Sequence, residues 1–561
     1  MKRNYLVAAS VMVVVVGLAS LGLFADDDGD GHSHRFEFKP DTLVLSRSVY
    51  TGTASTVTPG QVLPPGCVAT TITLPLIAGG TTTVKVKCAA ASDNGEYPNL
   101  QDAHNVWNND TADGSFGVTS PIFLDNITAH GELLDTLAVP SDLLVTSFSS
   151  KSELALNRST DGKSITFVSY HGGPGFLTAP NKLDVSNSNT AGVVDPTNPV
   201  VSNYYRSVAE VDARGHIMVT DGNAYSGNNG RAAIKGPSFY YLSGNDNNGG
   251  LSASQLTGTQ VGIDLITSTG SELLVPGQAP PLAPPNINML GDFEVTQVGY
   301  KKADKPGKDN NFRGLTIFNN TLYVTKGSGG NGINTVYQVG NAGELPTPAS
   351  ASSAPITILP GFPTTLASGA AQDGTTGHPV SFPFGIWFAN ANTLYVCDEG
   401  DGTSVAARTI NGQSNVADDA TLAMAGIQKW SLVNGTWQLL YVLQDGLDIG
   451  VPYNVENYPT SLNPATDGCR NLTGRVHHGR VTLFAVTSTI SQNGDQGADP
   501  NKLVKVTDRL EATTLPTGDG DNDGDDRLGH FVTIRAAQAG EVLRGVTFAP
   551  KEHGDDEHHD R

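Results

Sequence analysis

The sequence contains little positive charge. Its 34 Lys and Arg residues face 55 Asp and Glu residues, which gives a formal net charge of −21 at pH 7. Nucleic-acid phosphates and anionic membranes would meet no basic field on such a surface. We therefore expect no nucleic-acid partner.

Long apolar runs are also scarce, and the clearest one lies at the N-terminus. Lys2 and Arg3 precede an apolar stretch from Leu6 to Phe24, and Ala25 stands before an acidic run. This order is typical of a signal peptide, so residues 1–25 predict export to a secreted, cell-surface or periplasmic location. The stretch is also close to the length of a membrane span, which leaves an uncleaved N-terminal anchor as the alternative. Without that anchor we expect no membrane span.

No segment after the N-terminus shows the apolar period of a helix. Instead, 64 Gly and 32 Pro residues punctuate the chain, and a pattern of apolar strand, short turn and apolar strand recurs along it. The clearest copies are Phe312 to Gly327 and Pro383 to Gly400, with weaker copies beginning at Leu154, Arg231 and Arg470 and a half copy ending at Pro550. Four-stranded units repeated roughly every 40 to 90 residues are typical of a β-propeller.

The predicted fold is therefore an all-β propeller preceded by a small N-terminal β region that bears a disulfide. The recurring pattern appears six times, and the segment from Thr257 to Val275 is expected to add a seventh four-stranded blade, with six or eight blades as alternatives. Two strands between Thr119 and Thr136 are expected to complete the sheet begun by the C-terminal sequence LRGVTFAP. This arrangement closes the ring and removes exposed edge strands.

Four regions follow from these patterns. They are a signal peptide or anchor at 1–25, an acidic stub and cysteine hairpin at 26–115, the propeller at 116–550, and a His- and Asp-rich tail at 551–561.

The order of five segments resembles a group of secreted bacterial β-propeller proteins without an assigned activity. These segments are SPIFLDNITAHGELLDTLAVP, AYSGNNGRAA, FRGLTIFNNTLYVT, GIQKWSLVNGTW and LRGVTFAP. The resemblance spans roughly residues 116–550. It implies the fold and the export, and it brings no catalytic residues with it.

The four cysteines suit two disulfides in an exported protein. Cys67 and Cys88 flank an alternating apolar run that folds back at Gly79 and Gly80, so we expect these two to pair. Cys397 and Cys469 then pair between blades or remain buried thiols. The absence of a C-x-x-C spacing argues against a cysteine-based zinc or redox site.

Two acidic segments resemble calcium loops. The first has Asp26, Asp28, Asp30, Gly31 and Glu37 at every position of the loop pattern, and the second has Asp519, Asp521, Asp523, Gly524 and Asp526, with His530 at the place of the bidentate glutamate. Carboxylate oxygens at this spacing can surround one Ca²⁺, so calcium is the predicted cofactor. The first loop lacks flanking helices, and a solvated acidic tail is its alternative interpretation.

Histidine-containing segments offer two weaker candidate sites. Transition metals are one interpretation of the terminal tracts His32, His34, His553, His558 and His559, and soluble extensions are the other. The pair His477 and His478 on a hairpin turn is a weaker metal candidate. The sequence HGGPGF from His171 to Phe176 resembles an oxyanion loop of hydrolases. No G-x-S-x-G motif accompanies it, so we interpret it as a glycine-rich turn.

Four arginines stand at the start of the recurring pattern, namely Arg231, Arg313, Arg470 and Arg544. Equivalent positions in a propeller repeat lie near one mouth of the central channel, so these guanidinium groups are expected to form a positive funnel for carboxylates, sulfates or phosphates. The alternative is that each arginine clamps one blade to the next. Tyr225, Asn228 and Asn229 vary between repeats and are further ligand-binding candidates.

The leading functional hypothesis is an exported scaffold that binds a partner protein or an anionic glycan. The alternative is a calcium-assisted hydrolase or lyase for an acidic sugar, lactone or phosphoester, with Glu294, Asp398, Glu399 and Asp401 as candidate carboxylates. A purely structural envelope component is the third class. The fold alone does not choose among them.

Overall fold

The computed structural model describes residues 36–50, 68–75, 80–86, 119–147, 153–171, 205–222, 229–245, 312–327, 333–351, 354–364, 381–400, 424–458, 463–490, 499–516 and 527–552, the short segments 62–63, 89–90, 97–98, 105–106, 224–225, 263–267, 288–289, 409–410 and 413–414, and residues 460 and 497. The regular elements in these ranges are β-strands, and none of the ranges holds a helix long and apolar enough to cross a membrane. The predicted signal peptide or anchor at 1–25 lies outside them.

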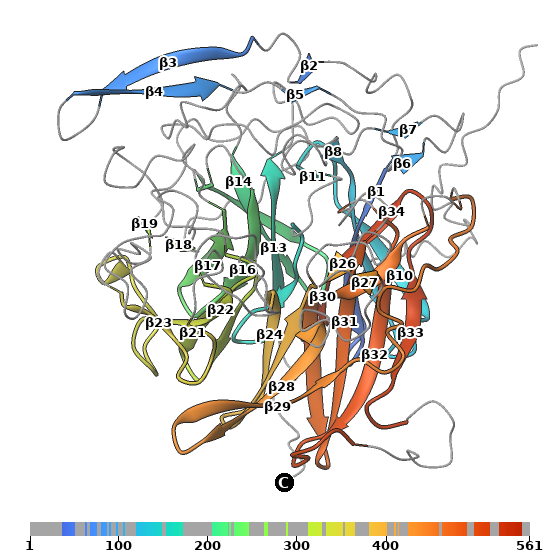
Figure 1. The fold of residues 1–561 in the computed structure, drawn as a ribbon. Coiled ribbons are helices and arrows are strands. Elements are labelled where there is room, and N and C mark those ends of the chain that lie inside the picture. Colours follow the sequence, from blue (N-terminus) through green and yellow to red (C-terminus); the bar gives the residue numbers. More distant parts are fainter. Residues whose placement is uncertain are drawn as a thin grey trace, which may run out of the picture. The chain divides into compact units, whose positions relative to one another are not determined.

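Six sheets of at least four strands form the blades among the described residues (Figure 1). Blade 1 contains β1 (Leu43–Val49), β9 (Ile122–Ile127), β10 (Leu133–Ala138) and β34 (Glu541–Phe548). Blade 2 contains β8 (Thr119–Ser120), β11 (Leu144–Ser147), β12 (Asn157–Arg158), β13 (Ser164–His171), β14 (Arg206–Asp212) and β15 (Ile217–Gly222). Blade 3 contains β16 (Gly230–Lys235), β17 (Phe239–Gly244), β18 (Ile263–Thr267) and β19 (Asn288–Met289).

The remaining three blades have the same four-stranded order. Blade 4 contains β20 (Leu315–Phe318), β21 (Thr321–Lys326), β22 (Thr335–Val339) and β23 (Ile356–Ile358). Blade 5 contains β24 (Pro383–Asn390), β25 (Thr393–Asp398), β28 (Gly426–Val433) and β29 (Thr436–Leu443). Blade 6 contains β30 (Ala465–His477), β31 (Arg480–Ile490), β32 (Lys502–Arg509) and β33 (Phe531–Ala536).

Smaller two-stranded sheets accompany the blades. They are β2 (Val62–Leu63) with β5 (Ala89–Ala90), β3 (Thr70–Pro75) with β4 (Thr81–Val86), β6 (Tyr97–Pro98) with β7 (Asn105–Val106), and β26 (Thr409–Ile410) with β27 (Gln413–Ser414). The β3–β4 pair is the hairpin that the alternating run between Cys67 and Cys88 predicts. Both cysteines lie outside the described residues, so their pairing stays a prediction.

The clearest sequence repeats fold as hairpins because their patterns specify both the strands and the turn. In blade 4, Asn319 and Asn320 have φ of 47° and 55°, the positive values that a tight hairpin turn requires and that Asn tolerates. The alternating residues Leu322 and Val324 of the following strand are fully buried. The same alternation produces the hairpin of β24 and β25 in blade 5.

The described blades number six, not the seven that the sequence predicted. Their inner strands contact one another in a closed cycle of β34, β12, β16, β20, β24 and β30, which returns to β34. The segment expected to form a seventh blade instead supplies β18, which pairs with β17 in blade 3. Its residues Ile263, Leu265 and Ile266 are buried, so this segment completes an existing sheet.

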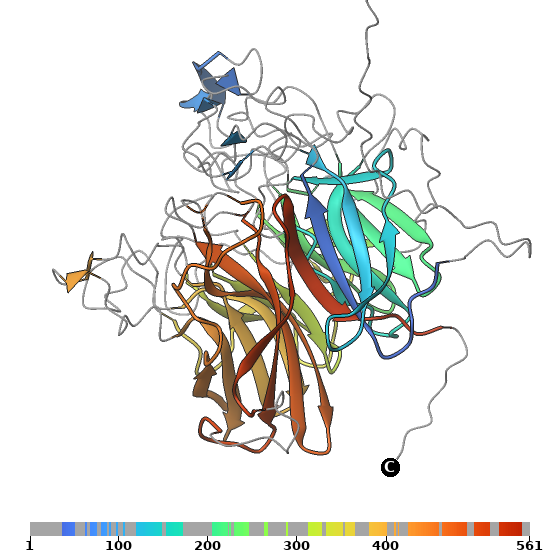
Figure 2. The ribbon, with the colours of Figure 1, turned by 90° about the vertical axis from the view of Figure 1, so that its right-hand side faces the viewer.

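Blade 1 is built from both ends of the propeller sequence. The C-terminal strand β34 pairs with β1, and β1 pairs with β9 (Figure 2). The expected joining of the region after residue 119 to the C-terminal strand is present, but β1 lies between the two. The domain boundary at residue 115 stays a prediction, although β1 shows that the preceding region contributes a strand to a blade.

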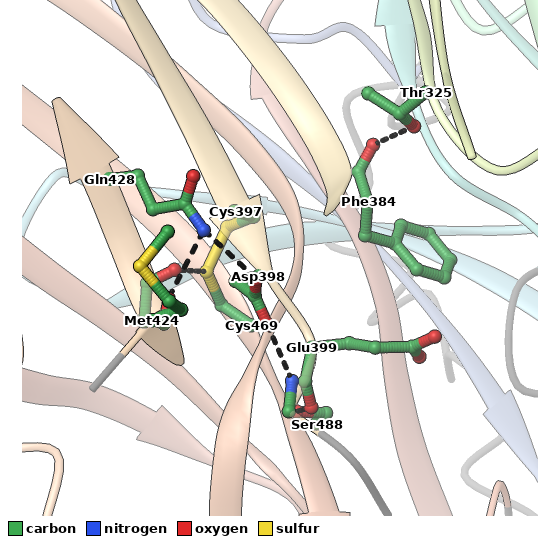
Figure 3. Close-up of a disulfide and its surroundings, with 11 residues drawn as sticks. Thr325, Phe384, Cys397, Asp398, Glu399, Met424, Gln428, Cys469 and Ser488 are labelled. Carbon is green, nitrogen blue, oxygen red and sulfur yellow. Dashed lines mark hydrogen bonds between the residues drawn. A yellow bond between two sulfur atoms is a disulfide. The ribbon is translucent and has the colours of Figure 1, made fainter. Parts of the chain in front are cut away.

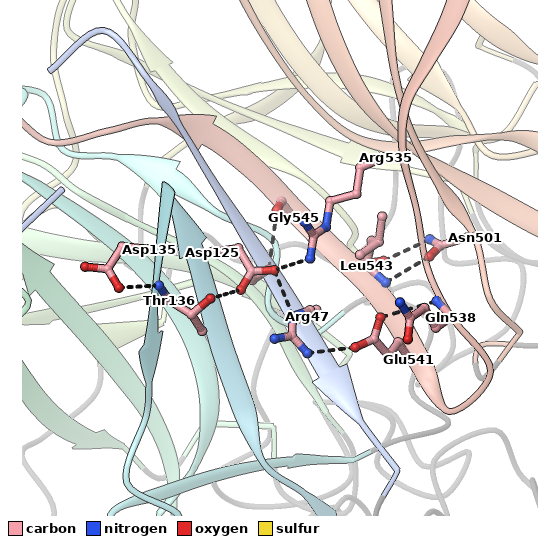
Figure 4. Close-up of polar contacts among 11 residues, drawn as sticks. Arg47, Asp125, Asp135, Thr136, Asn501, Arg535, Gln538, Glu541, Leu543 and Gly545 are labelled. Atoms are coloured by element: carbon pink, nitrogen blue, oxygen red, sulfur yellow. Dashed lines mark hydrogen bonds and ion pairs between the residues drawn. The ribbon is translucent and has the colours of Figure 1, made fainter. Parts of the chain in front are cut away.

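A cluster of charges fastens this closing blade to blade 6 (Figure 4). The buried Asp125 of β9 accepts hydrogen bonds from Nε of Arg47 at 2.8 Å and from Arg535 of β33 at 2.9 Å. Arg47 also pairs with Glu541 at 2.9 Å, and Thr136 donates to Asp125 at 2.8 Å. These contacts connect all four strands of blade 1 with the outer strand of its neighbour.

The apolar core lies between blades. One cluster joins blades 3, 4 and 5 and includes Tyr241, Val324 and Trp430. A second joins blades 5 and 6, and a third joins blade 6 with blade 1 through Phe484 and Val546. A further cluster joins blades 2 and 3, so each blade buries apolar residues against a neighbour, as a propeller requires.

Candidate functional site

The inner strands place one residue of each blade at an equivalent position, and we call this set the axial layer. Its members, in order of the chain, are Leu154, Arg231, Arg313, Phe384, Arg470 and Arg544. The next residue is small in five of the six blades, which allows close contact between neighbouring inner strands. A Cβ on Gly314 would lie 2.1 Å from the carbonyl oxygen of Phe384, and a Cβ on Gly385 would lie 2.6 Å from that of Arg470. Glycine is therefore needed at these two positions.

Hydroxyl groups mark the equivalence of these positions. Ser243 of blade 3 donates to the carbonyl of Arg313 at 2.9 Å, and Thr325 of blade 4 donates to that of Phe384 at 2.6 Å. Ser46 of blade 1 donates to the carbonyl of Leu154 at 2.7 Å. In all three cases the second strand of one blade holds the axial residue of the next.

A disulfide occupies the corresponding place between blades 5 and 6. Cys397 follows the same sequence pattern as Thr325, in TLYVCD against TLYVTK, and it is bonded to Cys469 (Figure 3). This confirms one of the two predicted alternatives for these cysteines, pairing between blades. It also places the described disulfide in the propeller rather than in the N-terminal region.

The four predicted arginines all lie in the axial layer and are buried, with 5% to 8% of each residue exposed. Arg231 donates to the carbonyl of Phe312 at 2.7 Å, the residue just before Arg313 in the next blade. Arg544 donates to the hydroxyl of Ser48 at 3.2 Å. The first contact reaches the next blade, as a structural clamp would, whereas the second lies within blade 1.

Glu399 brings two of the arginines together. Its carboxylate lies 3.1 Å from Nε of Arg470 in blade 6 and 3.7 Å from Nη2 of Arg313 in blade 4. Glu399 follows β25 of blade 5, so one carboxylate connects three consecutive blades. The sequence offered Glu399 only as one of several channel carboxylates and gave no sign of this bridge.

Arg231 belongs to the same electrostatic cluster. Burial lowers the pKa of its guanidinium well below the ordinary value, and the positive charge of Arg313 lowers it further. Glu399 and Glu153 oppose this by raising the pKa of Arg231. The charge of Arg313 in blade 4 is therefore felt by Arg231 in blade 3, and both residues are buried.

Glu153 is the second carboxylate of this region, and no sequence pattern points to it. It precedes Leu154, is 1% exposed, and accepts hydrogen bonds from the hydroxyl of Thr146 at 2.8 Å and from the hydroxyl of Tyr170. The ring of Tyr170 lies beneath the guanidinium of Arg206, 5.0 Å from the ring centroid. A polar interior therefore extends from the axial layer into blade 2.

Asp398 is buried beside the disulfide but is saturated with donors. Ser381 and the backbone N–H of Phe382 each donate to its carboxylate at 2.7 Å. Gln428 donates to the same carboxylate at 2.9 Å (Figure 3). Burial raises the pKa of Asp398 to about 7, although the hydrogen bonds from Phe382 and Ser381 act in the opposite direction. The side chain is held within blade 5 as a structural element.

The described residues do not test the two predicted calcium loops. Residues 26–35 and 517–526 lie outside them, and so do Asn228, Glu294 and Asp401. Where the structure describes the chain, no group of three or more His, Cys, Asp or Glu side chains is arranged to hold a metal ion. His530, the expected last position of the second loop, lies 3.0 Å from Asp445.

The remaining sequence candidates occupy separate places. Asn229 is buried, and its carbonyl accepts a hydrogen bond from the N–H of Asn245. His171 is buried with Nδ1 2.8 Å from Asp221, and the hydroxyl of Ser207 donates to the same carboxylate oxygen at 2.6 Å. Because the carboxylate stands between serine and imidazole, these three groups do not form a relay that activates the serine.

No protein-family model matches the chain, and no curated protein matches it. Similar solved structures include two variants of Synechocystis apocarotenoid oxygenase. The first has a TM-score of 0.33 at 8% identity and covers 92% of this chain and 95% of that chain. The second has a TM-score of 0.21 at 9% identity and covers 87% and 66%. The similarity is distant, and the fold assignment rests on the order and contacts of the sheets.

Proposed function

We propose that the chain is an exported binding scaffold whose axial layer captures the anionic groups of an acidic glycan. The observation that supports this most directly is that Arg313 of blade 4 and Arg470 of blade 6 meet at the single carboxylate of Glu399. The charges of Arg313 and Glu399 also shift the pKa of Arg231 in blade 3. Guanidinium groups stay charged and bind carboxylates and sulfates through paired hydrogen bonds.

The placement of the arginines favours a ligand over a purely structural role. Placing like charges together in a buried layer is unfavourable unless anions offset it. Clamping needs no such gathering, because Ser243 and Thr325 already hold neighbouring blades without charge. An anion entering the layer would relieve the repulsion between Arg231 and Arg313.

Burial limits what can enter. With at most 8% of each arginine exposed, the layer suits one terminal carboxylate or sulfate group better than an extended chain. The rest of a glycan would then lie outside the layer. Glycans rather than nucleic acids fit this proposal, because the overall charge of −21 disfavours a densely charged backbone.

The test measures retention of sulfated and carboxylated oligosaccharides by the purified protein, with and without Ca²⁺, and follows their products in the same samples. We expect retention without product, and Arg231→Gln should weaken it about tenfold, equivalent to about 1.4 kcal/mol. The matched control, Arg535→Gln, removes a half-buried, ion-paired arginine of blade 6 outside the layer and should leave retention unchanged.

Three results would redirect the proposal. Product formation that depends on Ca²⁺ would favour the hydrolase or lyase alternative. Equal loss of thermal stability in Arg231→Gln with and without oligosaccharide, together with unchanged retention, would make the arginines structural clamps. If the protein retains a protein partner but no oligosaccharide, the proposed ligand becomes an acidic surface of that partner instead of a glycan.

A further inference from the structure

Glu399 holds a position that an anionic ligand would also occupy. Its two carboxylate oxygens face different blades, with Oε2 3.1 Å from Arg470 and Oε1 3.7 Å from Arg313. The shorter distance allows a hydrogen bond, whereas the longer one is an ion pair without hydrogen-bond geometry. One side chain of this protein therefore already provides a carboxylate to the arginines.

The backbone of Glu399 is fixed from both sides. Its N–H donates to the carbonyl of Phe382 at 3.0 Å, and its carbonyl accepts from the hydroxyl of Ser488 in blade 6 at 2.6 Å. The Cys397–Cys469 disulfide ties the same turn to β30, directly before Arg470. Figure 3 shows the Glu399 side chain directed away from this disulfide. Rotation of the side chain alone is thus the available way to vacate the arginines.

We propose that Glu399 is a built-in competitor that occupies the anion site of the axial layer, so that an incoming carboxylate or sulfate must displace it. This inference rests on the proposed anion-binding function and concerns the regulation of the same site. The disulfide acts as a positioning element, because it fixes the turn from which Glu399 reaches Arg470.

The competition predicts in which direction the affinity for an external anion changes when Glu399 is replaced. Arg313 and Arg470 keep their charge at any ordinary pH, whereas Glu399 contributes one negative charge at their side. Replacing that carboxylate with a neutral amide of the same shape leaves the guanidinium groups without this competitor. Binding of an external anion should then become tighter, while the protein without anion should become less stable.

The experiment titrates sulfate and acetate separately against the wild-type protein, Glu399→Gln and Glu399→Asp, and measures affinity by calorimetry and melting temperature. Glu399→Gln should bind sulfate about tenfold more tightly or better. Glu399→Asp keeps the charge but withdraws it by one methylene, so it should bind sulfate with intermediate affinity. It also supplies a readout if the Gln variant fails to fold.

Glu210→Gln is the matched control. Glu210 is a buried carboxylate of blade 2 that pairs with Lys235 at 2.5 Å, away from the axial arginines. This variant should lose stability without any change in sulfate affinity. Its melting temperature should also rise with sulfate by the same amount as that of the wild type.

The outcomes separate the two proposals. Unchanged or weaker sulfate binding by both Glu399 variants would overturn the competitor role, even if wild-type binding and its loss in Arg231→Gln support the anion site. Binding by Glu399→Gln but not by the wild type would support the competitor and count against anion binding by the unmodified protein. Absence of binding in every variant would overturn both.

Discussion

The hydroxyl of Thr325 in blade 4 donates to the backbone carbonyl of Phe384 in blade 5 at 2.6 Å, and the Cys397–Cys469 disulfide stands at the equivalent place one junction later. Neighbouring blades are thus joined near the axial layer by different chemical bonds at one recurring position. Because each of these bonds joins the second strand of one blade to the inner strand of the next, it influences how closely the axial side chains approach one another.

Removing the hydroxyl of Thr325 should weaken the contact between blades 4 and 5 without leaving a cavity in the apolar core. Thr325→Val keeps the shape but leaves the buried carbonyl of Phe384 and the N–H of Gly314 without this partner. We expect a loss of about 1 to 2 kcal/mol in the free energy of unfolding. Urea unfolding monitors the change, and Thr316→Val on the partly exposed β20 should have less than half that effect. Equal effects of the two variants would contradict the junction role.

Loss of the disulfide should have a larger effect than loss of a hydroxyl. The Cys397–Cys469 bond spans a sequence separation of 72 residues, and closing such a loop restricts the unfolded chain by about 4 kcal/mol. The double variant Cys397→Ser/Cys469→Ser should therefore unfold at markedly lower urea concentration. An unfolding midpoint equal to that of the oxidised wild type would show that the bond adds nothing to stability.

Asp398 predicts a specific dependence of stability on pH. Burial raises its pKa to about 7 in the folded protein, whereas the unfolded value is 3.8, so between these values the folded state keeps a proton that the unfolded state has lost. Its contribution is therefore complete below pH 3.8 and declines as pH rises towards 7, by up to about 4 kcal/mol.

The comparison with Asp398→Asn isolates this contribution from other titrating groups. The stability of the wild type relative to this variant should fall as pH rises from 4 to 8, measured by urea unfolding at each pH. A difference that stays constant, or that grows with pH, would show that the donors from Ser381, Phe382 and Gln428 outweigh burial and keep the carboxylate ionised.

The charge cluster around Asp125 should control closure of the ring. Asp125→Asn removes the partner of Arg47 and Arg535 in a buried position, and such a loss typically costs about 3 kcal/mol. Amide hydrogen exchange should then accelerate in β1 and β34 before it does in blades 4 and 5. Asp142→Asn alters an exposed aspartate and is the control. Uniform acceleration of hydrogen exchange in all blades would contradict a local role of this charge cluster in closing the ring.

Local patterns in the sequence predicted the hairpins because their residues interact with near neighbours in the chain. The alternation around Leu322 and the Asn319-Asn320 turn specify one hairpin without reference to the rest of the protein. The equivalence of the four arginines also followed from their place in the repeat. The segment after Thr257 was misjudged because a strand pattern does not reveal which sheet it joins.

Long-range relationships were less accessible to the sequence. The strand β1 pairs with β34 across almost the whole propeller, and nothing in its local pattern identifies that partner. The bridge from Glu399 to Arg313 and Arg470 depends on three blades meeting in space. Glu153 was missed for the same reason, because its relation to Arg231 arises only after blades 2 and 3 pack together.

The most direct test of the anion site is a crystal structure of the protein soaked in selenate, with anomalous diffraction measured at the selenium edge. We predict a selenium peak in the axial layer within hydrogen-bonding distance of Arg231, Arg313 or Arg470, with a stronger peak in Glu399→Gln crystals. Selenium peaks confined to the outer surface, with none at the axial layer of either protein, would contradict it.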